Sequence, residues 1–238
     1  MKILAIDTAT EACSAALLID GQVSSHYQLA PREHSRLILK MIDDLLLQAD
    51  VAISQIDAIA FGRGPGSFMG VRIAAGVVQG IAFAHDIPVI PVSTLKAIAQ
   101  RAHIETQSSH ILVAIDARMD EVYWAQYSLD NDQWQLEGEE LVISPDNIDL
   151  TSILSAEDEC WTGAGTGWGS FAQRLLATDD SNRAIKLQAM LPECLPAAEQ
   201  IVQLAVDDYK AGTMLPAAHA IPVYLRNNVA KKPKPVVL

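Results

Sequence analysis

Apolar residues gather in short alternating or continuous segments along the first part of the chain, which is the pattern of β-strands. Three such segments span residues 3–6, 13–19 and 22–29. Asp20 and Gly21 lie between the second and the third, and Asp-Gly between two apolar runs is a strong signal for a tight hairpin turn. The third segment is more polar, so we expect it near an edge of the sheet.

The same layout returns later in the chain. Apolar segments at residues 110–115, 122–129 and 134–143 are again separated by short acidic turns. Two copies of a strand meander accompanied by helical segments indicate a duplicated α/β fold. A polar stretch beginning at residue 105 lies between the copies, and we therefore predict two domains, 1–104 and 105–238.

Residues 34–49 have the periodicity of a helix, with Leu37 and Leu45 on one face. Leu39 and Leu46 widen the apolar arc to about 200°, whereas a stripe of roughly 100° is enough to cover one core. Either both sides of this helix are buried within the chain, or its far side meets another chain.

A glycine- and proline-rich turn, Arg63-Gly-Pro-Gly-Ser-Phe68, follows a predicted strand at residues 56–61 and precedes a long apolar helix. Ser67 is placed to act as the N-cap of that helix. Backbone N–H groups at such a turn could hold an anion. Alternatively, the glycines only let the helix approach the sheet closely.

Two glycines, Gly76 and Gly80, lie four residues apart inside that helix, and Met69, Arg72 and Phe83 share their side. A glycine in a helix interior costs roughly 1 kcal/mol relative to alanine. Close approach of a second helix is the usual reason for keeping two of them. From these residues alone, the second helix could belong to the same chain or to another.

The chain of 238 residues has a formal net charge of −12, and the charge is unevenly placed. Residues 1–104 carry nine acidic and eight basic side chains, and the remainder carries twenty and nine. Such a balance argues against strong nucleic-acid binding by this chain alone, because neutralising phosphates needs clustered lysine and arginine. Three lysines, Lys231, Lys232 and Lys234, lie in a proline-rich end and are typical of a solvated tail.

Three widely spaced cysteines, Cys13, Cys160 and Cys194, without a Cys-x-x-Cys pair, fit a reducing compartment. Asp7 interrupts the place where a signal peptide would need its apolar run, and no apolar stretch reaches membrane-spanning length without a polar interruption. We therefore expect a cytoplasmic protein that does not enter a membrane.

Acidic turns follow the first strand of each copy, where actin-like ATPases and sugar kinases keep their phosphate loops. Only the positions match. The residue types differ from those of a phosphate loop, since Ala9 stands where a glycine is usual and Arg118 fills the second loop. An independent actin-like ATPase or phosphotransferase using Asp7 and Asp116 is the alternative function, and ATP is the cofactor that it would need. The residues of this possible vestigial nucleotide cleft are Asp7, Thr8, Thr10, Asp116, Gly163 and Gly165.

The six histidines show neither His-x-x-x-His nor His-Glu-x-x-His spacing, so we expect no bound catalytic metal. A serine, cysteine and histidine motif for nucleophilic catalysis is also missing. A metallopeptidase is accordingly the least supported function.

Six motifs carry a family resemblance from residue 1 to about residue 226: Asp7-Thr8-Ala9-Thr10, Arg63-Gly-Pro-Gly-Ser-Phe68, Gly70-Val-Arg-Ile73, Asp116-Ala-Arg118, Glu121-Val-Tyr123 and Pro222-Val-Tyr-Leu-Arg226. With these motifs the chain resembles the TsaB (YeaZ) family of bacterial tRNA threonylcarbamoyladenosine biosynthesis proteins. The resemblance implies two α/β domains of the duplicated actin-like (ASKHA, RNase H-like) fold, shared with the catalytic paralogue TsaD. TsaD carries a metal-binding His-x-x-x-His shortly after this helix and the next strand, whereas residues 92–97 here contain no histidine.

The resemblance further implies a subunit that is not itself catalytic and has no cofactor. TsaB proteins pair with TsaD, or with themselves in its absence, through the first two helices of the N-terminal domain. Those helices correspond to about residues 34–49 and 70–85. The implied interface residues are Leu39, Leu46, Met69, Arg72, Gly76, Gly80 and Phe83.

A third chain, the ATPase TsaE, joins them. The assembly transfers threonylcarbamoyl from its adenylate to N6 of the adenosine next to the anticodon, in tRNAs that read codons beginning with A. In this resemblance the present chain holds TsaD in an active conformation and meets tRNA only through the complex.

Overall fold

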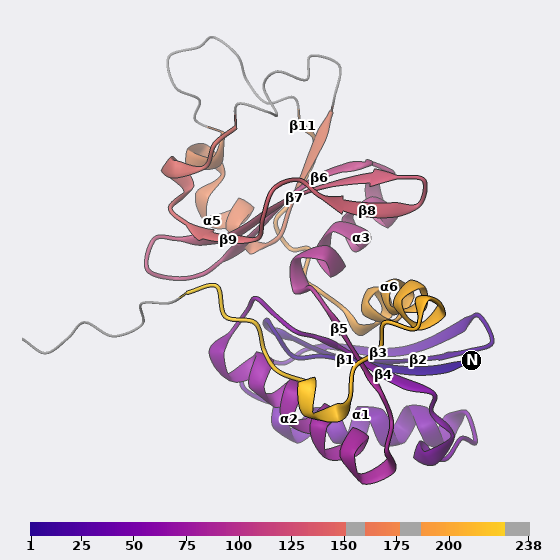
Figure 1. The fold of residues 1–238 in the computed structure, drawn as a ribbon. Helices are drawn as coiled ribbons and strands as arrows, with labels where there is room; N and C mark the ends of the chain where they lie inside the picture. Colours follow the sequence, from indigo (N-terminus) through magenta and orange to yellow (C-terminus); the bar gives the residue numbers. More distant parts are fainter. Residues whose placement is uncertain (151–159, 177–186, 227–238) are drawn as a thin grey trace, which may run out of the picture.

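Two β-sheets organise the protein into two lobes, as Figure 1 shows for the computed structural model, which describes residues 1–150, 160–176 and 187–226. The first sheet has five strands in the order β3-β2-β1-β4-β5. Their bounds are β1 Lys2–Asp7, β2 Ala12–Ile19, β3 Gln22–Leu29, β4 Ala58–Gly62 and β5 Val89–Val92. Strands β1 to β3 form the predicted antiparallel meander, and β4 and β5 add to it in parallel.

The hairpin between β2 and β3 turns at Asp20 and Gly21, which both have positive φ, 48° and 89°. This pair of left-handed residues is what a two-residue hairpin turn requires. Strand β3 lies at the edge of the sheet, as its polar sequence predicted.

The second sheet repeats this topology, with the order β11-β10-β6-β7-β8 and β9 paired to β7. Its strands are β6 His110–Asp116, β7 Val122–Asp130, β8 Gln133–Leu136, β9 Leu141–Ile143, β10 Trp161–Ala164 and β11 Leu187–Leu191. Strands β6 to β8 form an antiparallel meander, and β10 and β11 are parallel to β6, so the predicted duplication is confirmed. Together the two sheets form a duplicated α/β fold, as predicted.

One predicted strand, residues 134–143, is in fact two short ones. The chain leaves the sheet after β8 and returns as β9, and Gly138 between them has a φ of 85°. Residues 137–140 carry three acidic side chains and a glycine, which favour an exposed turn over a continuous strand.

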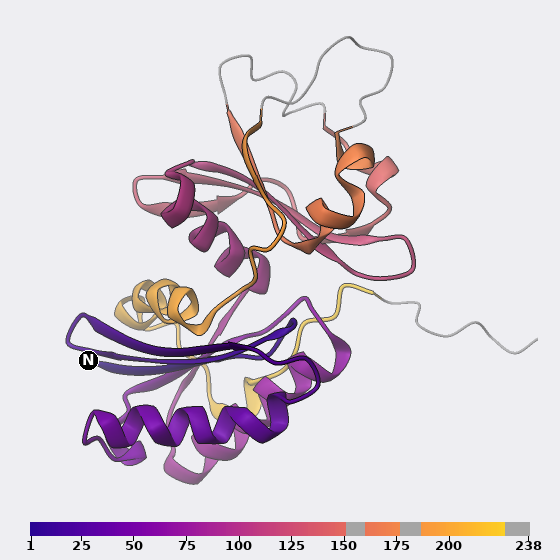
Figure 2. The same cartoon turned by 180° about the vertical axis from the view of Figure 1, so that it is seen from behind.

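Helices cover both faces of the first sheet and both faces of the second. On the first sheet, α1 His34–Gln48 and α2 Phe68–His85 lie side by side on one face, and α6 Ala198–Ala211 covers the other (Figure 2). On the second, α3 Thr94–Thr106 and α5 Thr166–Leu175 cover opposite faces. Three short 3-10 turns complete the described elements: η1 Ile53–Gln55, η2 Pro145–Asn147 and η3 Ala217–His219.

Helices α3 and α6 are exchanged between the lobes. Helix α3 follows the last strand of the first sheet but packs on the second, with Leu95 and Ile98 in its core. Helix α6 follows the second sheet but packs on the first, where Ile201 and Val202 meet Ile3. The two helices also contact each other between the sheets, so they form the middle layer of the molecule (Figure 1). The domain boundary at residue 105 stays a prediction. In space, α3 and α6 each pack on the sheet that lies on the other side of this boundary in the sequence.

Candidate functional site

Asp7, the first of the predicted nucleotide-cleft residues, ends β1 and is completely buried. The Ala9 N–H donates to Asp7 Oδ1 over 3.1 Å, and Oδ2 has no partner among the described residues. Burial raises the pKa of this carboxyl to about 7, and the hydrogen bond from Ala9 offsets only part of that rise. Gly62 explains the tight enclosure, because a Cβ at that position would overlap Asp7 Oδ2.

The turn before α2 packs directly on the loop that follows Asp7. Ser67 N–H donates to the Ala9 carbonyl over 2.7 Å, and Thr8 Oγ1 donates to the Gly70 carbonyl over 2.7 Å. A Cβ at Gly66 or at Gly70 would overlap the Ala9 or Thr8 carbonyl. The glycines therefore serve close backbone packing, and they bring the start of α2 onto the first sheet.

Ser67 also caps α2 as predicted, since its hydroxyl accepts a hydrogen bond from the Gly70 N–H over 3.4 Å. The N–H of Ser67 is used by Ala9 in the same turn. These contacts support the packing interpretation of the turn over the anion cradle.

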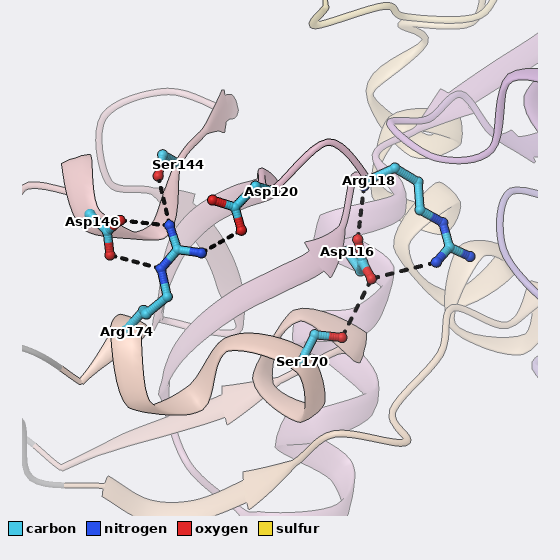
Figure 3. Close-up of polar contacts among 7 residues, drawn as sticks. All are labelled: Asp116, Arg118, Asp120, Ser144, Asp146, Ser170 and Arg174. Carbon is cyan, nitrogen blue, oxygen red and sulfur yellow. Dashed lines mark hydrogen bonds and ion pairs between the residues drawn. The ribbon is translucent and has the colours of Figure 1, made fainter.

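Asp116, the corresponding acid of the second lobe, ends β6 and is held by its own turn (Figure 3). Its Oδ1 accepts from the Arg118 N–H over 2.8 Å. Its Oδ2 accepts from Ser170 Oγ over 3.4 Å and lies 3.7 Å from Arg118 Nη1. Both carboxylate oxygens thus have partners from the protein itself.

Three consecutive residues of this turn, Arg118, Met119 and Asp120, have positive φ, between 57° and 63°. Left-handed backbone is unfavourable for residues other than glycine, asparagine and aspartate, and a run of three needs to be held in place. Arg174 holds one end by binding Asp120 over 2.5 Å and Asp146 over 2.6 and 2.8 Å (Figure 3). The hydrogen bond from Arg174 lowers the pKa of Asp146.

Gly163 and Gly165, the last two predicted nucleotide-cleft residues, pack against atoms of their own lobe. A Cβ at Gly163 would overlap the Trp168 ring, and one at Gly165 would overlap the Ala114 carbonyl. Trp168 is buried, and its Nε1 donates to the Leu112 carbonyl over 2.8 Å. These two glycines therefore allow packing inside the second lobe.

A cavity of about 830 Å³ does lie between the lobes. Of the six predicted nucleotide-cleft residues, Thr10 and Asp116 line it. Asp7 and Thr8 lie beneath the turn before α2, and Gly163 and Gly165 are buried in the second lobe. Nucleotide binding through these six residues stays a prediction.

Four arginines line the cavity, and the sequence patterns did not point to this group. They come from the loop before α1, from α2, from the strained turn after β6 and from the segment after η3: Arg32, Arg72, Arg118 and Arg226. They are more than 20 residues apart in the sequence, so no charge run announces them.

The outer side of α2 is apolar and exposed. Phe83 is 84% exposed and Met69 62% exposed. Apart from the adjacent residues and the nearby backbone of α2 itself, no heavy atom of the described chain comes within 4 Å of a Cβ built at Gly76 or Gly80, so neither glycine is needed for packing against another described element. Arg72 lies on the same side and is exposed.

Helix α1 adds a smaller exposed apolar area. Leu39 is 51% exposed, as expected for an interface residue, and Leu47 is 82% exposed although the sequence did not single it out. Leu46 was among the implied interface residues, but it is 9% exposed and packs in the core between α1 and the first sheet. We therefore leave it out of the exposed face.

By length and hydropathy alone, α2 could cross a membrane, with 18 residues and a mean hydropathy of 1.3. Its inner side, including Val71, Ala74 and Val78, is packed in the core of the first lobe. Among residues 1–150, 160–176 and 187–226, no three His, Cys, Asp or Glu side chains lie together as a metal site would require.

Comparison with known proteins identifies the family. The TsaD family model, described as tRNA N6-adenosine threonylcarbamoyltransferase, matches residues 24–234. The tRNA threonylcarbamoyladenosine biosynthesis protein TsaB of Escherichia coli K12 is 45% identical over 99% of both chains, and that of Haemophilus influenzae is 39% identical over 99% of this chain and 98% of its own. The chain belongs to the TsaB family.

A solved structure agrees with this TsaB assignment. YeaZ from Pseudomonas aeruginosa is 46% identical, with a TM-score of 0.86 over 94% of this chain and 99% of that one. A tRNA N6-adenosine threonylcarbamoyltransferase of Chlorobium limicola is 31% identical, but the match covers 46% of this TsaB chain and 35% of the longer protein. The relationship to that transferase is thus one of shared segments, whereas the relationship to TsaB extends over the whole chain.

Proposed function

We propose that this TsaB chain is the non-catalytic scaffold and activating subunit of a complex that modifies tRNA. The TsaB relatives bear the name of tRNA threonylcarbamoyladenosine biosynthesis, and we infer that this chain is involved in the same process. In the complex, threonylcarbamoyl passes from threonylcarbamoyl-AMP to N6 of the adenosine beside the anticodon. The tRNAs concerned read codons that begin with A.

The observation that carries this proposal is the exposed side of α2. Gly76 and Gly80 cost helix stability, and yet no described part of the chain fills the space above them. Small residues four apart let the backbone of a second helix come close. We infer that a helix of another chain packs there, with Met69 and Phe83 on either side of the glycines.

Helix α1 extends this surface, because it lies beside α2 and presents Leu39 (Figure 2). Two helices from each partner would then form a four-helix contact. The exposed apolar side chains would leave water on association, and that burial favours it by roughly 25 cal/mol for each Å² covered. We expect a TsaD-type catalytic subunit as the physiological partner and a homodimer when that subunit is missing.

The chemistry of the described residues favours a non-catalytic scaffold over a catalytic subunit. Asp7 is sealed beneath the turn before α2, and Asp116 is bound by Arg118 and Ser170. The segment where the resemblance places the metal-binding histidines of TsaD begins α3 here, and it reads Ser93, Thr94, Leu95 and Lys96. We infer that catalysis takes place on the partner and that a TsaE-type ATPase joins the assembly.

We also infer that tRNA is reached only through the complex, since the chain carries a net charge of −12. The proposed place of work is the cytoplasm, where tRNA is modified. The alternative of an independent ATPase or phosphotransferase has less support, because its two acids are enclosed or already paired.

Reconstitution tests the proposal. Purified TsaD-type and TsaE-type chains from the same organism are mixed with tRNA and threonylcarbamoyl-AMP, with and without this chain, and modified adenosine is quantified by mass spectrometry. We expect product only when this chain is present, and no product from this chain alone. Equal product without it would contradict the proposal, and tight binding and turnover of Mg-ATP by the isolated chain, lost in Asp7→Asn, would favour the alternative.

A further inference from the structure

The exposed helices α1 and α2 carry few charges, and most of these charges are paired within the chain. The lysine, arginine and aspartate residues of the two helices are Arg36, Lys40, Asp43, Asp44 and Arg72. Arg36 is paired with Glu33 over 2.6 Å. Lys40 is paired with Asp44 over 2.8 Å. Each helix therefore keeps one exposed charge that forms no ion pair with a described residue, and the two charges have opposite signs.

The unpaired charge of α2 is Arg72, which lies among apolar residues and glycines on the outer side of the helix. Its Nε donates to Tyr224 Oη over 2.7 Å, and its Cζ lies 3.4 Å from the centre of the Phe68 ring. Neither Nη atom hydrogen-bonds to a described residue, so both donors of the planar fork remain available. A partner helix packed over Gly76 would take this guanidinium out of water, which is strongly unfavourable unless the partner supplies an acceptor, and a carboxylate fits the fork best.

The unpaired charge of α1 is Asp43, which lies between two exposed leucines. Leu39 and Leu47 are each four residues away, so the three side chains follow one another along one face of the helix. Leu39 is 51% exposed and Leu47 82% exposed. Covering these leucines would remove water from Asp43 as well, and a cation on the partner would then be needed.

Within one chain these two charges do not meet, since no ion pair joins Arg72 to Asp43. Figures 1 and 2 place α2 between α1 and the segment around η3. Arg72 binds Tyr224, which follows that segment, so it lies on the flank of α2 that faces away from α1. A two-fold axis that crosses α2 near Gly76 and Gly80 brings α1 of a second copy over this flank.

We propose that a second copy of this chain docks on α1 and α2 through two reciprocal ion pairs, in which Arg72 of each copy binds Asp43 of the other. In a two-fold contact, residue i of one copy meets residue j of the other and the reverse contact follows, so both leftover charges are satisfied twice. The inference rests on the partner surface of the proposed function and adds the charges that set its register. Apolar side chains alone permit several registers, whereas a register that leaves these charges unpaired is penalised.

A charge exchange tests this proposal, with self-association of the isolated chain measured by analytical ultracentrifugation at low salt. Arg72→Asp and Asp43→Arg should each weaken association at least about tenfold, because like charges then face each other across both contacts. An equimolar mixture of the two variants should associate to within about threefold of wild type, because every contact in the mixed dimer joins opposite charges. Recovery on mixing cannot come from a role of either residue in folding.

Milder variants and matched controls complete the design. Arg72→Gln and Asp43→Asn should each weaken association less than the reversed charges do, and added salt should weaken wild type more than either of them. Asp44→Asn and Arg36→Gln remove charges that are paired within the chain, and they should leave association unchanged. Circular dichroism and thermal melting verify that each variant is folded.

Three results would overturn the proposal: a mixture that associates no better than its separate variants, an equal loss in Asp44→Asn, or a wild-type chain that stays monomeric. A fourth is Arg72→Gln weakening the binding of a TsaD-type subunit while self-association is unchanged, which would assign the opposing carboxylate to that subunit.

The tRNA modification assay distinguishes this inference from the scaffold function. If the mixture fails to associate but modified adenosine still requires this chain, the reciprocal pairing is wrong and the scaffold function stands. If mixing restores association but product forms without this chain, the scaffold function is wrong and the surface serves self-association.

Discussion

Arg63 and Glu140 join the two lobes through an ion pair in which Arg63 Nη2 lies 3.2 Å from Glu140 Oε2. The Glu140 side chain is 7% exposed, and its other oxygen accepts hydrogen bonds from Tyr127 Oη over 2.9 Å and from Ser93. Burial, and then the neighbouring Glu140 charge, raise the pKa of Tyr127, so its hydroxyl stays a donor. The turn before α2, the start of α3 and the second sheet are thus tied at one carboxylate.

We predict that Glu140→Ala lowers the free energy of unfolding by about 2–4 kcal/mol, because it leaves Arg63, Ser93 and Tyr127 without their shared acceptor. Urea unfolding followed by circular dichroism measures the change. Glu139→Ala is the matched control, since Glu139 is an exposed neighbour and should change stability by less than about 0.5 kcal/mol. Equal effects of the two variants would contradict the structural role of Glu140.

Replacing Gly76 should change monomer stability and association in opposite directions. Gly76→Leu should raise the free energy of unfolding of the monomer by about 0.5–1 kcal/mol, because leucine is the better helix former and the position is exposed, with open space around an added Cβ. The same variant should weaken association with a TsaD-type subunit, or with itself, by at least about tenfold. Analytical ultracentrifugation and thermal melting on the same sample measure both quantities.

Leu39→Asp on α1 should likewise weaken association while the monomer stays folded, since Leu39 is half-exposed. If Gly76→Leu and Leu39→Asp both unfold the chain, the two sides belong to the core. If both leave association intact, the partner binds elsewhere.

Gly66, ten residues before Gly76, should respond to an added side chain in the opposite way. Gly66→Ala should lower the free energy of unfolding by about 1–3 kcal/mol, because the added Cβ would overlap the Ala9 carbonyl and separate the turn from the loop after Asp7. Chemical denaturation compares it with Gly76→Ala, which should be neutral or stabilising. Equal stability of the two alanine variants would show that the turn can relax without cost.

Asp7 should make stability fall with rising pH. Its folded pKa of about 7 lies above the ordinary value of 3.8, so between these two pH values the folded protein holds a proton that the unfolded chain releases. The stabilisation is complete below about pH 4, is lost as the pH rises towards 7, and does not change further above that. Asparagine cannot ionise, so the difference in unfolding free energy between wild type and Asp7→Asn should shift by up to about 4 kcal/mol over this range.

Urea titrations of both proteins at pH 4.5, 6.0 and 8.0 measure that difference. Using the difference removes the contributions of other carboxylates, which are common to both proteins. A difference that does not vary with pH would mean that Asp7 is ionised in the folded protein.

Much of the fold follows from local patterns. The Asp20-Gly21 hairpin, the two meanders and the Ser67 cap all depend on a few neighbouring residues, and all are present. The sequence of residues 134–143 misled because its apolar residues suggested one strand, whereas Gly138 and its acidic neighbours break it. Leu46 misled for a related reason, since helical periodicity alone cannot tell which side of a wide apolar arc meets the sheet.

The candidate site could be predicted from the sequence less well than the fold, because it is formed by residues that only the tertiary structure brings together. The cavity arginines come from four separate segments, and only folding brings Arg32 to Arg226. The left-handed turn at residues 118–120 contains no glycine, so its conformation is set by contacts such as the one between Arg174 and Asp120. The glycines at 163 and 165 illustrate the reverse, because a sequence rich in glycine can serve packing as readily as ligand binding.

The exchange of α3 and α6 has a consequence for how the protein is made. On one face of the first sheet, Ile3, Ala60 and Val92 pack in a core to which α6 contributes Ala198, Ile201, Val202 and Ala205, more than a hundred residues later in the chain. A ribosome therefore exposes a half-covered sheet until residue 211 has emerged. The earliest segment to be synthesised is among the last to be completed, because a nascent chain that stops at residue 104 lacks the helix α6 that packs on its sheet.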